Sequence, residues 1–171
     1  NDKLTGNGST NFLDGGRGVD TLTGGAGNDT YIVDLVEATG KVQDTIVETS
    51  TGGTLDTVQL RGSSTNAVAV TLTAGTGIEA INASATGSSK LNLTGIASSN
   101  TLTGNDADNI LNGLAGADTM IGGAGNDAYI VDNVSDVVTE ETNGGTDLVQ
   151  VAIAAVGGTY TLGSHVENAT L

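Results

Sequence analysis

A nine-residue repeat built on glycine constrains this chain more than any other feature. Counting from Gly6 gives GNGSTNFLD, GGRGVDTLT and GGAGNDTYI, and counting from Gly104 gives GNDADNILN, GLAGADTMI and GGAGNDAYI. Position 6 of each unit carries Asp or Asn, and position 8 carries a bulky apolar residue. The position-6 residues are Asn11, Asp20, Asp29, Asn109, Asp118 and Asp127, and the position-8 residues are Leu13, Leu22, Tyr31, Leu111, Met120 and Tyr129. An acid or amide required once per turn indicates a metal site as well as a fold.

The repeat length predicts which units lie next to each other. If each unit is a six-residue turn followed by a three-residue strand, two units complete one flattened coil. Position 6 of one unit then lies beside position 6 of the next unit but one, roughly 4.8 Å away. The predicted neighbours are Asp2 with Asp20, Asn11 with Asp29, Asn100 with Asp118, and Asn109 with Asp127. Carboxylates at that spacing repel each other unless a cation lies between them.

Composition identifies the kind of cation and excludes several partners. The 171 residues include 20 Asp plus Glu against 5 Lys plus Arg, a net charge of −15, with no Cys and one His. Carboxylate, amide and carbonyl oxygens therefore form the ligand set, and flexible oxygen-only coordination favours Ca²⁺ over Mg²⁺. Nucleic acid and anionic membranes are poor partners because both need a basic patch. No apolar run is long enough to insert into a membrane.

A longer period organises the chain into two units. Residues 4–34 and 102–132 align without gaps at an offset of 98, and 20 of the 31 pairs are identical. We therefore predict a first unit over 1–101, with a nonapeptide block at 1–34 and a β-rich spacer at 35–101. The second, incomplete unit covers 102–171, with a block at 102–132 and a spacer at 133–171. Residues 1–5 fit positions 5–9 of a further nonapeptide, so we expect a segment of a longer repetitive protein.

The pattern predicts an all-β fold without helices. Apolar residues alternate with small or polar ones over 68–73, 91–93 and 149–153, which is typical of strands. Repeats that cannot bury a face alone are expected to stack into a solenoid. Tyr31 and Tyr129, at position 8, are expected to pack in its core.

GGAGNDTYI and GGAGNDAYI resemble the G-G-x-G-x-D-x-U-x repeat of the RTX (repeats-in-toxin, hemolysin-type) family. The resemblance implies a right-handed parallel β-roll, or β-solenoid, with calcium in the glycine-rich turns. It implies that the position-6 side chains bind calcium together with turn carbonyls, and that Asp34 and Asp132 are ligands at the ends of the blocks. The implied carbonyl ligands are Gly15, Arg17, Gly24, Ala26, Gly113, Ala115, Gly122 and Ala124. Asn11 and Asn109 depart from the acidic pattern and predict weaker or differently liganded sites.

Several other polar residues are expected to have no such role. His165 is alone, with nothing nearby that would supply a catalytic triad, and is expected in a surface loop. The remaining acids are interpreted mainly as solvated loop charges, although some could bind further calcium. They are Asp44, Glu48, Asp56, Asp136, Glu140 and Asp147.

Three classes of function fit these features unequally. The first is a calcium-stabilised structural module of a secreted or cell-surface bacterial protein, such as an adhesin, surface layer or fibre-like array. Its partners would be calcium and neighbouring repeat units or copies of itself. The second is a calcium-dependent folding and secretion module of a type I-exported toxin, lipase or protease whose catalytic domain lies elsewhere. An enzyme, most plausibly a two-carboxylate glycosidase, fits least because nearly all acids belong to the repeat and no Trp exists to stack a sugar. The 98-residue period favours the first class.

Overall fold

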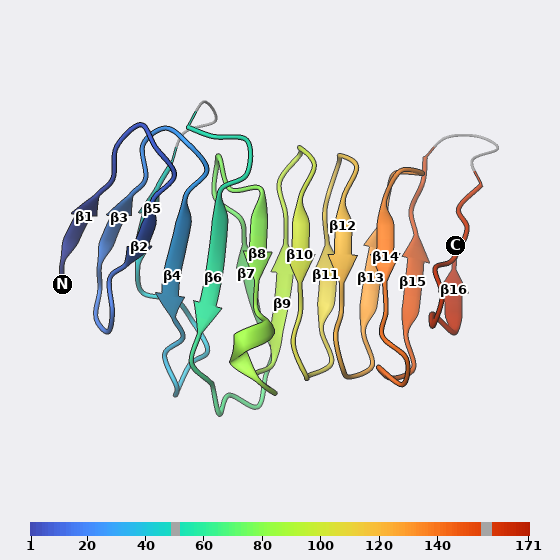
Figure 1. Ribbon diagram of the computed structural model, residues 1–171. Coiled ribbons are helices and arrows are strands. Elements are labelled where there is room, and N and C mark those ends of the chain that lie inside the picture. Colours follow the sequence, from blue (N-terminus) through green and yellow to red (C-terminus); the bar gives the residue numbers. More distant parts are fainter. Residues whose placement is uncertain (49–51, 155–158) are drawn as a thin grey trace.

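The strands of this chain form one flattened coil that advances from the N-terminus to the C-terminus, as Figure 1 shows. The computed structural model describes residues 1–48, 52–154 and 159–171. Within these ranges every strand pairing is parallel. The described residues contain no α-helix, only a single 3₁₀ turn, η1 (Ser84–Thr86). The expected all-β, parallel-stranded solenoid is therefore confirmed. No helix of the described chain has the length and apolar character needed to span a membrane.

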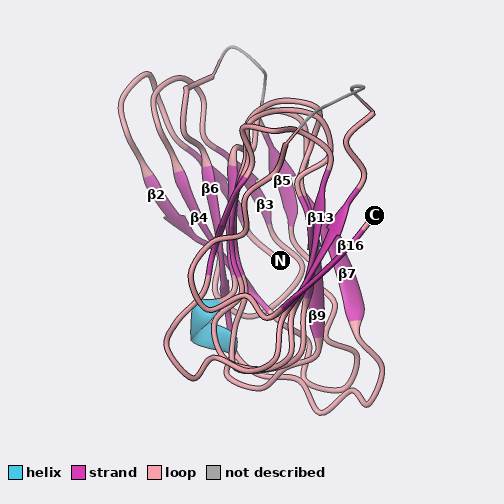
Figure 2. Ribbon diagram, turned by 90° about the vertical axis from the view of Figure 1, so that its right-hand side faces the viewer, coloured by secondary structure: helices cyan, strands magenta, loops and turns pink. Residues whose placement is uncertain are grey.

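Successive strands alternate between two faces of the coil, which Figure 2 shows nearly end-on, except that the last two strands, Leu148–Val151 and Asn168–Thr170, pair in the same sheet. One face is a seven-stranded sheet of β2 (Phe12–Asp14), β4 (Thr30–Asp34), β6 (Thr57–Arg61), β8 (Ala80–Asn82), β10 (Thr101–Thr103), β12 (Thr119–Ile121) and β14 (Val137–Thr139). The other face has a three-stranded sheet of β1 (Lys3–Thr5), β3 (Thr21–Thr23) and β5 (Thr45–Val47). It continues as a six-stranded sheet of β7 (Val70–Thr73), β9 (Leu91–Thr94), β11 (Ile110–Asn112), β13 (Ala128–Val131), β15 (Leu148–Val151) and β16 (Asn168–Thr170).

The register within the blocks agrees with the predicted pairing of every second nonapeptide. Leu4 lies opposite Leu22, and Leu13 lies opposite Tyr31. In the second block, Leu111 pairs with Tyr129. The spacers continue the same coil, because β4 pairs with β6 and β13 pairs with β15.

The position-8 side chains form the core between the two faces. Leu22, Tyr31, Leu111, Met120 and Tyr129 are fully buried. Spacer residues extend this row along the coil, namely Leu60, Ile81, Leu91, Leu93, Val138 and Val149. The core consists mainly of Leu, Ile and Val side chains from both faces, so a chain with few aromatic residues can fill it.

Candidate metal sites

A ladder of carboxylates runs along the turn edges of the coil, and each of its members immediately precedes a strand, although some strands follow an asparagine or another residue instead. In the first block, the backbone N–H of Asp2 donates to Oδ1 of Asp20 at 2.6 Å, and that of Asn11 donates to Oδ1 of Asp29 at 2.7 Å. In the second block, Asn109 donates in the same way to Asp127 at 2.7 Å. We call each turn with its following strand a rung of the ladder. Position 6 is acidic partly because its carboxylate accepts a hydrogen bond from a backbone N–H of the preceding rung on the same edge.

The ladder continues into both spacers, where the sequence carries no nonapeptides. Asp20 donates its N–H to Asp44, and Asp29 donates to Asp56 at 2.6 Å. The second unit repeats these contacts from Asp118 to Asp136 and from Asp127 to Asp147. Glu79 and Glu167 add further rungs by accepting the N–H groups of Asp56 and Asp147.

The interpretation of the spacer acids as solvated loop charges is therefore wrong for four of them. Asp56, Asp136, Glu140 and Asp147 are 0–7% exposed, and Asp44 and Glu48 are half-buried. The signal that could have found the three aspartates is an acid followed two residues later by an apolar residue that packs in the core, as in Asp56-Thr57-Val58 and Asp147-Leu148-Val149, whereas Glu140 is followed by Thr142 and lacks it. This is the position-6 and position-8 pattern without its glycine turn.

The second oxygen of most ladder carboxylates lies buried without a protein partner. Within the described residues, no hydrogen bond reaches Oδ2 of Asp20, Asp29, Asp56, Asp118, Asp127 or Asp147, nor Oδ1 of Asp132. Asp29 and Asp127 are only 1% and 2% exposed. Burying a carboxylate oxygen without a donor or counter-charge is strongly unfavourable. The donor set therefore fits a hard cation that accepts several carboxylates, and calcium has this preference.

Burial and like charge raise the pKa of several of these carboxyls. Burial is the main cause at Asp127, whose pKa rises to about 7, with repulsion from Asp147 and Asp108 adding to it. Burial also raises the pKa of Glu140 to about 8, with Asp147 and Asp127 as the nearest like charges. Upward pKa shifts, again led by burial, occur at Asp44, Asp56, Asp118, Asp132 and Asp147. A bound cation would favour the charged forms.

Asparagine makes a different kind of rung. Oδ1 of Asn109 accepts the N–H of Asn105 in its own turn at 2.9 Å, while its Nδ2 donates to the Leu91 carbonyl of the preceding rung at 2.7 Å. Asn100 likewise accepts from Ile96, and Asn11 accepts from Asn7. Because an amide both donates and accepts, these rungs leave no oxygen that needs a cation. The weaker or different calcium binding expected at Asn11 and Asn109 stays a prediction.

The glycine-rich turns bring backbone carbonyls toward the ladder. A Cβ built on Gly6 would overlap both Oδ1 of Asn11 and the Gly24 carbonyl oxygen, so these two oxygens lie close together. A Cβ built on Gly104 would likewise overlap both Oδ1 of Asn109 and the Gly122 carbonyl oxygen, so these two oxygens also lie close together. A Cβ at Gly95 would meet Asn100 together with the Gly113 carbonyl.

The other predicted turn residues lie around these sites. A Cβ on Gly15 would meet Asp20 at 2.8 Å. Ala26 and Ala124 donate their N–H groups to the carbonyls of Asn7 and Asn105, one rung away. Arg17 and Ala115 lie on exposed turns. The assignment of the eight carbonyls as ligands stays a prediction.

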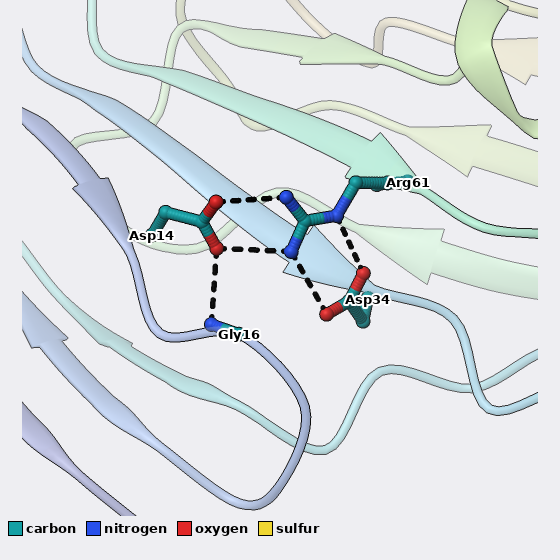
Figure 3. Close-up of polar contacts among 4 residues, drawn as sticks. All are labelled: Asp14, Gly16, Asp34 and Arg61. Carbon is teal, nitrogen blue, oxygen red and sulfur yellow. Dashed lines mark hydrogen bonds and ion pairs between the residues drawn. The ribbon is translucent and has the colours of Figure 1, made fainter.

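Asp34 and Asp132 occupy equivalent places but have different neighbours. Arg61 donates from Nε to Oδ1 of Asp34 at 2.7 Å and from its two terminal nitrogens to Asp14 at 2.7 and 2.9 Å, as Figure 3 shows. This contact lowers the pKa of Asp14. Asp132 has no such arginine in the ion pairs of the described residues, and its N–H donates to Asp136. The ligand role predicted for both aspartates stays a prediction.

Tyr31 and Tyr129 fill the core as expected, but each also reaches the ladder. The hydroxyl of Tyr31 donates to Glu48, and that of Tyr129 donates to Glu140. Position 8 therefore serves two purposes in the last nonapeptide of each block. Sequence reasoning missed this because the two glutamates lie in the spacers.

Comparison with known families agrees with the geometry. The family model of the RTX calcium-binding nonapeptide repeat matches residues 1–31 and 94–129, in four copies. No curated protein matches the chain. The two matched segments are RTX calcium-binding repeats, so the family resemblance of the sequence is confirmed, and calcium is the metal that such repeats bind.

Proposed function

We propose that this chain of RTX repeats is a calcium-binding structural module of a secreted or cell-surface bacterial protein, such as an adhesin, surface layer or fibre-like array. The observation that carries the proposal is the row of buried carboxylate oxygens along both edges of the coil, which have no hydrogen-bond partner among the described residues. Because these buried carboxylates need bound cations, the coil would be stable only where calcium is abundant, as it is in the extracellular medium. We assign the module no catalytic role.

The ligands proposed for calcium are the ladder side chains and the turn carbonyls of the two blocks. Position-6 carboxylates would supply Oδ2, since their Oδ1 already accepts a backbone N–H. The carbonyl oxygens of Gly24, Gly113 and Gly122 lie near the side-chain oxygens of Asn11, Asn100 and Asn109. Asp132 has one buried oxygen that no described residue hydrogen-bonds, so it is a better proposed ligand than Asp34, which accepts hydrogen bonds from Arg61.

The proposed mechanism is coupled binding and folding. The net charge of −15 and the 27 glycines oppose compaction of the free chain. Calcium would remove the repulsion between neighbouring rungs, and its binding free energy would become folding free energy. Each rung then offers a template for the next, so order would spread along units 1–101 and 102–171 and into neighbouring units.

The second candidate is a folding and secretion module attached to a type I-exported toxin, lipase or protease. The 98-residue period favours the array, because it recurs as block plus spacer and the spacer strands continue the same sheets. Small-angle X-ray scattering of two and four tandem copies of the chain separates the two. An array module predicts a rod whose length grows in proportion to copy number. Independent, flexibly linked modules would contradict the proposal.

Circular dichroism during a calcium titration tests the folding mechanism. We expect the β signal to appear with calcium, to disappear in a chelator and to return only weakly with magnesium at equal concentration. An equally strong β signal in the chelator would refute coupled folding.

A further inference from the structure

We infer that each unit contains a calcium site at the junction between its last nonapeptide and its spacer, formed by Asp29, Glu48 and Asp56 in the first unit and by Asp127, Glu140 and Asp147 in the second. In each junction site, one carboxylate oxygen from each residue lies within 4.8 Å of the others. The inference rests on the proposed calcium-dependent function and extends it to spacer residues beyond the matched repeats.

The second junction site is the more deeply buried of the two. Asp127, Glu140 and Asp147 are 2%, 7% and 1% exposed. Oδ1 of Asp127 accepts the Asn109 N–H, and Oδ1 of Asp147 accepts the Asp127 N–H, so both Oδ1 atoms are occupied. Oδ2 of both aspartates is buried and has no hydrogen-bond partner in the described chain. These two oxygens point to a ligand that the protein itself does not supply.

The first junction site is built in the same way. Asp29 and Asp56 are 1% and 0% exposed, and their Oδ1 atoms accept the N–H groups of Asn11 and Asp29. Their Oδ2 atoms are again buried without a protein partner. Glu48 is half-buried and approaches from the spacer, where Tyr31 holds it through a hydroxyl hydrogen bond.

A glycine and a tyrosine shape each junction site. A Cβ on Gly122 would overlap Oδ2 of Asp127 and the Tyr129 hydroxyl, and it would lie 2.6 Å from Oε1 of Glu140. Gly24 has the corresponding neighbours in the first unit. A Cβ on Gly144 would lie 3.1 Å from Oε2 of Glu140 and 2.8 Å from the Gly123 carbonyl, so a backbone oxygen lies beside the glutamate. Carboxylates together with a backbone carbonyl form an oxygen-only set of the kind calcium takes.

The two sites arise from spacers of different length. Glu48 follows Asp29 after residues 30–47, whereas Glu140 follows Asp127 after residues 128–139. The chain nevertheless brings an aspartate, a glutamate, a second aspartate and a tyrosine hydroxyl together both times. A loop charge with no role would not keep this arrangement across a change in spacer length.

The ion pairs in the described part of the chain leave the second junction site without a neutralising cation. The ion pairs of the described residues join Arg61 to Asp14 and Asp34, and the N-terminal amine to Asp20. Among the described residues, no positive group pairs with Asp127, Glu140 or Asp147, so these three carboxylates repel one another. A divalent ion removes most of this repulsion.

Tyrosine-sensitised terbium emission can locate a bound ion beside Tyr31 and Tyr129, because Tb³⁺ replaces Ca²⁺ and is excited through a nearby aromatic ring. The chain has three tyrosines and no tryptophan. Tyr160 lies close enough to Asp136 for that carboxylate to raise the pKa of its hydroxyl, after the larger effect of burial, so Tyr160 could also sensitise an ion. All samples therefore carry Tyr160→Phe, and native mass spectrometry counts the bound calcium ions in parallel.

Glu140→Gln is the decisive variant, and Glu141→Gln is its matched control, because Glu141 is the adjacent residue but is exposed. We expect Glu140→Gln to weaken one calcium-binding step by about tenfold to a hundredfold, the loss typical of a disturbed metal site. It should also remove the Tyr129-sensitised emission, whereas Glu141→Gln should change neither. Glu48→Gln should remove only the Tyr31 component and leave the Tyr129 component in place, which keeps the test valid if Glu140→Gln fails to fold.

The outcomes separate this inference from the proposed function. If Glu140→Gln and Glu48→Gln bind as many ions as their parent, with the same affinity and emission, the junction sites are refuted while calcium-dependent folding stands. If the parent chain itself binds no calcium, both the proposed function and the junction sites fail.

Discussion

Gly122→Ala adds a single methyl group at the point where side-chain oxygens of Asp127, Tyr129 and Glu140 come together, and so tests whether this close arrangement is needed for stability. Gly122 does not have the positive φ that would itself require glycine. The added Cβ would overlap Oδ2 of Asp127 and the Tyr129 hydroxyl and would press on Glu140 at 2.6 Å. All three side chains are buried, so they cannot swing into solvent to make room.

The magnitude follows from the packing. Forcing an extra methyl group into a well-packed interior costs about 1–3 kcal/mol. The urea dependence of unfolding for small proteins is about 1–3 kcal/mol per molar. We therefore expect the urea midpoint of Gly122→Ala, measured by far-UV circular dichroism in saturating calcium, to fall by about 1 M.

Gly8→Ala is the control for this measurement. Gly8 also lies in a nonapeptide turn without a positive φ, but a Cβ there would meet no atom within 4 Å. Its substitution should leave stability unchanged or raise it by up to about 1 kcal/mol, because alanine restricts the unfolded chain. Equal midpoints for Gly122→Ala and Gly8→Ala would refute the converging geometry.

Three further substitutions probe the rest of the coil. Leu111→Ala should cost about 2–5 kcal/mol in urea unfolding, because Leu111 is fully buried, while Ile110→Ala, at a neighbour 45% exposed, should cost far less. Arg61→Met should destabilise by less than about 1 kcal/mol, since its ion pairs are partly exposed, and the loss should shrink in 1 M salt; a loss that does not change with salt would contradict this. Leu114→Gly should stabilise by about 1 kcal/mol in thermal unfolding because Leu114 adopts φ 64°, and destabilisation would show that its side chain matters more than its backbone.

Counting in nines predicted which residues stack on each other within the blocks, because the repeat length there is constant. Rungs within a block are 18 residues apart, so the neighbours of Asp20 and Asp29 follow from counting alone. Position 8 marked the core for the same reason, as the burial of Leu22 and Met120 confirms.

The same count fails for most spacer rungs because the spacer loops vary in length, although Asp136 still lies 18 residues after Asp118. The rung after Asp20 lies 24 residues on, and the rung after Asp29 lies 27 residues on. Without a fixed period, an acid before a spacer strand looks like any other loop charge. Glu48 and Glu140 lie outside the ladder altogether, and a tyrosine from the core brings them to it. Such a contact depends on tertiary packing and has no period in the sequence.

The asparagine rungs have a consequence for how the coil loosens. Asn105 donates to Thr86 and to the Ser89 carbonyl, and this network joins Asn109. No described carboxylate oxygen between Asp56 and Asp118 is buried without a partner. The described carboxylates at the centre of the chain therefore need no cation. In the flanking rungs, buried carboxylate oxygens have no hydrogen-bond partner among the described residues and repel one another. When calcium is scarce, amide hydrogens of β8 to β11 should exchange most slowly, and local opening should start in the rungs on either side.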